Sequence, residues 1–119
     1  MRWRWLISSV YLALWTIALL VPVTQEMGEA VATDAEDRSY FTKSLHVAAY
    51  TLLCLFGAWL RPRGKWRWVL LAFLTCHAMG TEYFQQFVPT RTASWRDVGL
   101  DHIGILLGVV LSWRIWRRV

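Results

Sequence analysis

Apolar positions gather in four long stretches along the chain, at residues 6–23, 44–60, 68–88 and 98–113. The first, LISSVYLALWTIALLVPV, runs for 18 residues without a charge, and the second is equally uninterrupted apart from His46. At about 18 apolar residues a membrane span becomes the leading interpretation. The third and fourth stretches carry polar residues towards one end, so hydropathy alone supports them less well.

Long parts of the first two stretches have no polar face. A soluble four-helix bundle shows a polar face along each helix, whereas LALWTIALLV and YTLLCLFGAWL are apolar all round. The composition agrees, since 56% of the residues are hydrophobic and nine of the 119 are Trp. The sequence therefore predicts one all-α domain, residues 1–119, of a polytopic membrane protein with four transmembrane helices at about 5–23, 43–60, 67–88 and 97–114.

Basic residues orient the predicted helices. Nine of the thirteen Lys and Arg, and none of the eight carboxylates, fall on one side if four helices cross the bilayer. The positive-inside rule places that side, and with it both termini, in the cytoplasm. Seven of the Trp flank the same positions, as in an interfacial aromatic belt. The basic residues are Arg2, Arg4, Arg61, Arg63, Lys65, Arg67, Arg114, Arg117 and Arg118.

The net charge of +5 thus has a simple cause in topology and in contact with anionic lipid, and nucleic acid is not expected as a partner. The N-terminus also imitates a secretory signal peptide, because MRWRW precedes an apolar run and AVA follows at residues 30–32. The run is long for that purpose, however, and Glu26 and Glu29 lie between it and the small residues. We therefore expect a retained first helix.

The cysteines give no sign of a metal or redox site. Cys54 and Cys76 fall in different apolar stretches without metal-binding spacing, so we expect packing residues rather than a disulfide. The acidic side chains and the histidine of the polar positions described next do not have a spacing that requires a metal ion either. No metal and no cofactor is expected.

Ionisable residues inside a span are costly, at roughly 2.5 to 3.5 kcal/mol near the helix centre, and they persist where they face protein or water. If the second helix enters from outside and the third leaves there, His46 lies about one turn in and Glu82 about two turns from the exit. Asp101 lies about one turn inside the fourth helix. All three are therefore predicted at similar depth, in the outer half of the membrane.

Their neighbours share helix faces with them. On the second helix the spacing i, i+3, i+7 aligns Lys43, His46 and Tyr50, and on the fourth Asp97 and Asp101 are followed by Gly104 and Gly108, which we assign to helix packing. The third helix offers a stripe of Glu82, Gln85, Gln86 and Pro89. Because the link to the fourth helix is short, we predict one polar pocket that binds a ligand, lined by Lys43, His46, Tyr50, Glu82, Gln85, Arg91, Asp97 and Asp101.

Plainer interpretations exist for each element of this pocket. His46 could be an interfacial residue at a helix start, and Arg91 with Asp97 could fix the hairpin. The remaining polar groups could hold the bundle by interhelical hydrogen bonds, at about 0.6 kcal/mol each. Small apolar residues would hold a bundle at less cost, so carboxylates, an imidazole, a lysine and an arginine at one depth favour a site.

The segments TKSLHVAAYTLL and EYFQQFVPTRTASWRDVGLDHIGILLG resemble the VanZ-like family of small bacterial membrane proteins, named for a protein associated with teicoplanin resistance. That family shows Asp-Lys, His and Tyr in one block, then Glu-x-x-Gln, Pro-x-Arg, Asp and Asn-x-x-Gly-x-x-x-Gly. The matching positions here are Lys43, His46, Tyr50, Glu82, Gln85, Pro89, Arg91, Asp97, Gly104 and Gly108.

Two positions depart from the pattern, because Thr42 stands where Asp is common and Asp101 where Asn is common. The resemblance covers about two thirds of the chain, from Thr42 onward, and leaves the first helix as generic apolar sequence. It implies a multi-pass protein of the bacterial inner membrane and no established reaction.

Three functions from different classes remain open. The favoured one is recognition of the headgroup of an envelope lipid or cell-wall precursor, with Lys43 and Arg91 holding a phosphate or carboxylate; the resemblance links this to glycopeptide resistance. A membrane-embedded enzyme acting on a lipid phosphate is the second, although no complete hydrolase signature is present. An accessory subunit of a larger membrane complex is the third. For the enzyme, the catalytic candidates are His46, Glu82, Asp97 and Asp101.

Overall fold

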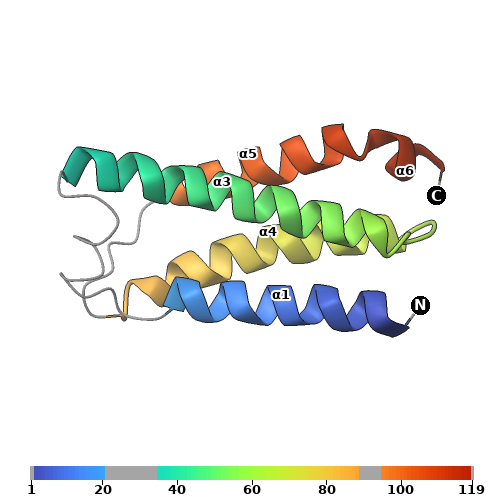
Figure 1. Cartoon of the computed structure of the whole chain (residues 1–119), viewed down its shortest axis with the longest axis horizontal. Coiled ribbons are helices and arrows are strands. Elements are labelled where there is room, and N and C mark those ends of the chain that lie inside the picture. The colour runs from blue at the N-terminus through green and yellow to red at the C-terminus, as the bar shows by residue number, and fades with distance from the viewer. Residues whose placement is uncertain (1, 21–34, 89–94, 119) are drawn as a thin grey trace.

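The structure, a computed structural model, describes residues 2–20, 35–88 and 95–118, with side chains from residue 43 onward in the second of these segments. Its long helices are α1 (Arg2–Leu20), α3 (Ala35–Trp59), α4 (Trp66–Gln85) and α5 (Trp95–Leu111), and the short α6 (Trp113–Arg118) follows (Figure 1). Every described element is helical, which confirms the all-α prediction.

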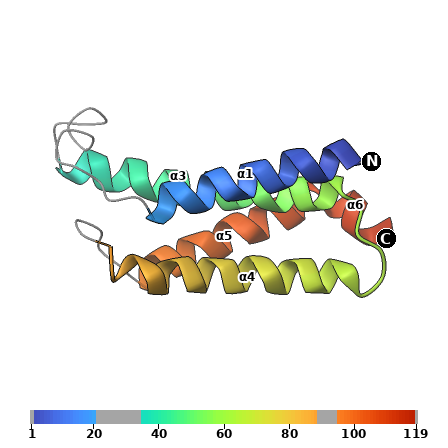
Figure 2. The same ribbon diagram turned by 90° about the horizontal axis from the view of Figure 1, so that it is seen from below.

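The helices run side by side with alternating direction. The two chain ends and the link between α3 and α4 lie at one end of the bundle in both views (Figures 1 and 2). The most extensive contact joins α3 to α5, while α1 packs on α3 and α4, and α4 packs on α5. Among the described helices, α1 alone is long and apolar enough to cross a membrane by length and composition.

Helix boundaries differ in places from those expected from hydropathy. Helix α3 begins at Ala35, well before the apolar stretch that starts near residue 43. Polar residues such as Glu and Arg are good helix formers, so a helix continues where an apolar run does not. At the other end of the chain, α5 stops at Leu111 and α6 restarts after Ser112, whose hydroxyl accepts from the indole N–H of Trp116 (2.7 Å) and donates to the carbonyl of Gly108.

The close contact of α3 with α5 depends on two glycines. A Cβ atom at Gly104 would lie 2.5 Å from the carbonyl oxygen of Val47, and one at Gly108 would overlap Cys54. The hydroxyl of Thr51 also donates across the interface to the carbonyl of Gly104 (3.0 Å). The structure thus places both glycines directly against the backbone of α3, the arrangement by which small residues bring helices together.

Polar and apolar side chains are distributed in the opposite sense to that of a soluble bundle. The buried set includes His46, Glu82, Gln85 and Asp101, together with a small apolar core around Tyr50. Large hydrophobic side chains are exposed on every long helix, among them Leu14, Phe73 and Leu106. In water such an outer surface would be unusual for a monomer, since contiguous apolar patches are generally small.

A candidate polar site between the helices

A buried imidazole–carboxylate pair lies at the centre of the polar residues. His46 Nδ1 and Asp101 Oδ1 are 2.7 Å apart, and the side chains are only 5% and 1% exposed. Asp101 precedes Gly104 by three positions, so it lies on the face of α5 that approaches α3 most closely. The glycine contact therefore positions the carboxylate within reach of the imidazole.

Two further carboxylates lie around this pair. Glu82 of α4 is buried and Asp97 of α5 is half-buried, and both are close enough to His46 to interact with it electrostatically. Lys43, one turn before His46 on α3, is half-buried at the same end. The structure thus brings together groups from α3, α4 and α5 that the sequence placed on separate helix faces.

Tyr50 lies one turn further along α3 and belongs to a second polar network. Its hydroxyl is 2.9 Å from Nδ1 of His77, and Nε2 of His77 is 2.7 Å from the hydroxyl of Thr16. A longer contact of 3.4 Å joins Tyr50 to the hydroxyl of Thr81. Tyr50 is fully buried, and it is close enough to Asp101 and Glu82 to interact with them electrostatically. The two networks are therefore adjacent.

Hydrogen-bond counting fixes the direction of the bonds in the second network. The hydroxyls of Thr16 and Thr81 each donate to a carbonyl of their own helix, at 2.7 and 2.8 Å. Thr16 must then accept from Nε2–H of His77, which leaves Nδ1 to accept from Tyr50. In the reverse order, Nδ1–H of His77 would donate to Tyr50 and Thr16 would donate to Nε2. Thr16 would then lose its 2.7 Å bond to the carbonyl of its own helix, and Tyr50 would donate across the 3.4 Å contact to Thr81, so the first assignment makes better bonds.

Sequence reasoning missed His77 and Thr16. For His77 the sequence offered a signal, because it is an ionisable residue in an apolar stretch. Thr81 and Gln85 follow it at i+4 and i+8. Such a stripe lies on one face of a helix. Thr16 offered no signal, because threonine is common in helices that are otherwise apolar and its partner lies on another helix.

Gln85 forms a hydrogen bond within the protein, whereas the sequence predicted that it lines the ligand pocket. Its side-chain amide donates to the carbonyl of Leu19, 2.9 Å away, in the last turn of α1. Carbonyls in the last turn lack a partner within their helix, so Gln85 caps α1 from α4. The neighbouring Gln86, which the sequence placed on the same stripe, is exposed.

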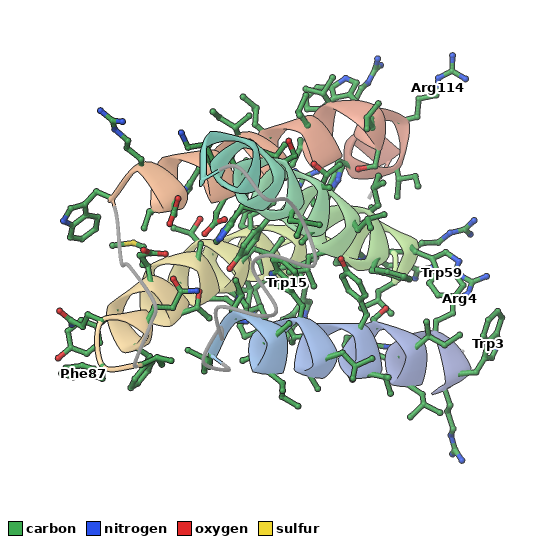
Figure 3. The ribbon with its side chains drawn as sticks, turned by 60° about the vertical axis from the view of Figure 1, so that its left-hand side comes forward. Trp3, Arg4, Trp15, Trp59, Phe87 and Arg114 are labelled. Carbon is green, nitrogen blue, oxygen red and sulfur yellow. The ribbon has the colours of Figure 1, made fainter. Side chains whose placement is uncertain are left out.

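Trp15 adds a side chain from a fourth helix, α1, to the site. Its ring meets that of His46 edge to face, with centroids 6.2 Å apart. Figure 3 shows the side chain rising from α1 into the space between the helices. The indole N–H of Trp15 is buried and has no hydrogen-bond partner among the described residues, so it is a donor directed into the interior next to His46.

The predicted site residues thus fall into three groups. His46, Tyr50, Glu82, Gln85 and Asp101 are buried, and Lys43 and Asp97 are half-buried. Arg91 and Pro89 lie outside the described residues. Within the described part of the chain, no three His, Cys, Asp or Glu side chains converge as metal ligands, while the thiol of Cys54 is buried and that of Cys76 exposed, both free.

An all-helical bundle with ionisable groups inside and large hydrophobic side chains outside has the character of a helical membrane protein, and the apolar helix α1 is compatible with that class. Comparison with protein families identifies the group within that class. A family model described as VanZ/LLP1 matches residues 8–117, and the chain belongs to this family, as the motifs of its sequence indicated. No curated protein and no solved structure matches the chain.

Proposed function

We propose that the chain crosses the bacterial inner membrane four times, with both termini in the cytoplasm. The outward hydrophobic side chains of α3, α4 and α5 support this, because they would otherwise face water. The helices of 17 to 25 residues would be about 26 to 38 Å long, which brackets a bilayer core of about 30 Å, and α5, the shortest, would fall about 4 Å short of it.

The end of the bundle that holds the termini also fits a cytoplasmic interface. There the guanidinium of Arg4 lies 5.3 Å from the ring centre of Trp59, and Trp3 meets Trp59 edge to face. Figure 3 shows these three side chains together at this end. Arg67 stacks on Trp68 in the same way. Basic and aromatic side chains together are typical of the headgroup region on the positive side of a membrane protein.

We further propose that the polar cluster binds the headgroup of an envelope lipid or a lipid-linked cell-wall precursor. The observation that carries this proposal is the buried His46–Asp101 pair, with Glu82 and Asp97 beside it. A buried ion pair contributes little net stability, and small residues already join α3 to α5. An ionisable cluster in that position is therefore better explained by a ligand than by packing.

A headgroup would enter from the edge at which Lys43 and Asp97 are half-buried, since the central side chains are closed off in this conformation. Lys43 would hold a phosphate or carboxylate, and Glu82 would accept hydrogen bonds from amine or sugar hydroxyl groups. The unpartnered indole N–H of Trp15 supplies a further donor beside His46.

Lipid retention tests this proposal. We expect the chain purified in mild detergent to retain an envelope lipid that mass spectrometry identifies, and His46→Gln and Glu82→Gln to lose it at equal folded yield. His102→Gln is the matched control, because Nδ1 of His102 bonds to the Val98 carbonyl of its own helix (2.7 Å). Retention by all variants at the wild-type level would show that the cluster serves architecture alone.

A second candidate, hydrolysis or transfer at a lipid phosphate, rests on the orientation of His46. A carboxylate bonded to Nδ1 leaves Nε2 as the base or nucleophile, the arrangement that general base and nucleophilic catalysis use. An enzyme would release phosphate or transfer a phosphoryl group from the retained lipid on incubation, whereas a binding protein would return it unchanged.

A further inference from the structure

A groove of about 700 Å³ lies between α1, α3 and α4, near the link that joins α3 to α4 and away from the polar cluster. Its floor is made of buried apolar side chains such as Leu53 and Leu74. The exposed Arg61 and Arg63 line its outer part, and none of the residues that line it is a carboxylate. The groove is therefore apolar along its length and positive at its mouth.

The backbone at Arg61 supports a role for its guanidinium. Arg61 follows α3 with φ of 55°, and its N–H donates to the carbonyl of Ala58 at 2.9 Å, as at many helix ends. Glycine takes this left-handed conformation without strain, whereas a residue with a Cβ pays a free-energy cost. Gly64 shows the same φ three residues later. Because glycine would suit this position better, the presence of arginine indicates that its side chain has a role.

A polar atom within the groove also lacks a partner. Ser8 of α1 lines the groove, and its hydroxyl oxygen is buried with no hydrogen-bond partner among the described residues. A buried unpaired hydroxyl is costly. The Ser8 hydroxyl lies next to apolar side chains and a short way along α1 from the positive mouth of the groove. The glycerol region of a bound lipid would lie at this level.

We propose that this groove binds one anionic phospholipid of the leaflet at this end of the bundle, which is the cytoplasmic leaflet in the topology proposed above. An acyl chain occupies the apolar floor, Arg61 and Arg63 hold the phosphate, and the hydroxyl of Ser8 donates to an ester oxygen. Arginine suits phosphate because its fork of donors matches two oxygens at once. Basic residues between helices on the cytoplasmic side are a recognised basis for anionic lipid binding.

Titration of the purified full chain with phosphatidylglycerol and with phosphatidylcholine, read by native mass spectrometry, tests the proposal. We expect one phosphatidylglycerol per chain, bound well ahead of phosphatidylcholine. Arg61→Gly with Arg63→Gln should weaken it about 25-fold, the effect of two arginines near a membrane surface. Arg61→Gly removes the guanidinium and relieves the backbone, so this variant should fold normally.

Two controls make the outcome decisive. Arg114→Gln with Arg117→Gln removes the same charge from α6, where both side chains are exposed, and Figure 3 shows Arg114 pointing away from the bundle. This pair should bind phosphatidylglycerol as the wild type does, and so should His46→Gln, which alters only the polar cluster. Equal loss in the α6 variant, equal binding of both lipids, or full binding by the Arg61 and Arg63 variant would each overturn the proposal.

Discussion

Nδ1 of His46 and Oδ1 of Asp101 are 2.7 Å apart, although 55 positions separate these residues in the chain. The contact exists because Gly104 and Gly108 let α5 lie directly on the backbone of α3. A side chain larger than hydrogen at either glycine would move the carboxylate away from the imidazole. The polar site and the helix packing of this protein are therefore one structural unit.

The His46–Asp101 pair should show strong energetic coupling. We expect His46→Leu and Asp101→Leu each to destabilise the chain by about 3 to 5 kcal/mol, because each leaves a buried polar partner uncompensated. The double variant should lose clearly less than the sum of the two. Asp101→Asn should cost less than Asp101→Leu, because an amide can still bond to the ring. Denaturant titration in detergent micelles measures all four, and simple additivity would contradict the pairing.

Gly104 and Gly108 should differ sharply from Gly80 and Gly99. Gly104→Ala and Gly108→Ala should destabilise the bundle by about 1 to 3 kcal/mol, since the added Cβ atoms meet α3. Gly80→Ala and Gly99→Ala are matched controls, because a Cβ there meets nothing within 4 Å. These controls should be neutral or stabilising by up to about 1 kcal/mol, from helix propensity. Thermal unfolding in micelles distinguishes them, and four equal effects would rule out the close contact.

Gln85 and Gln86 offer a test of the cap on α1. Gln85→Leu removes the donor to the Leu19 carbonyl, and we expect a loss of about 1 to 3 kcal/mol because that carbonyl is left without a partner. Gln86→Leu alters an exposed side chain and should change stability by less than about 0.5 kcal/mol. Hydrogen exchange should show faster opening at the end of α1 in the first variant. Equal protection in both variants would argue against the cap.

The hydrogen-bond order around His77 predicts one tautomer. We expect nitrogen NMR to find the proton of the neutral ring on Nε2, with Nδ1 accepting from Tyr50. Tyr50→Phe removes that donor and should shift the Nδ1 resonance strongly, whereas Thr81→Ala should shift it little, because its contact with Tyr50 is 3.4 Å. A proton found on Nδ1 in the unaltered chain would reverse the assigned order.

Much of the fold was predictable, because helix formation and face alignment depend on neighbours along the chain. The run of apolar residues indicated the helices, and the spacing of His46 and Tyr50 put them on one face. The start of α3 at Ala35 was not predicted, since hydropathy marks where a helix is apolar and not where it begins. Four membrane crossings follow from the sequence pattern and stay a prediction.

The candidate site was predictable in its members and less so in its contacts. The positions of Asp101 and Glu82 indicated a shared depth with His46, and the structure brings these three together. It differs for Gln85, which bonds to α1, and it adds His77 and Thr16, which no pattern assigned. A partner on another helix depends on how both helices rotate and slide, and that information is not local.

The sequence by itself determined that the chain is helical, which residues share a face, which end is basic and which family it resembles, because each of these is set by spacing or charge along the chain. Only the tertiary structure decided that His46 bonds to Asp101, that Tyr50 reaches His77, and that Arg61 and Ser8 line one groove. Those contacts arise where separate helices meet, and the distance between two such helices depends on the side chains, or their absence, at the crossing.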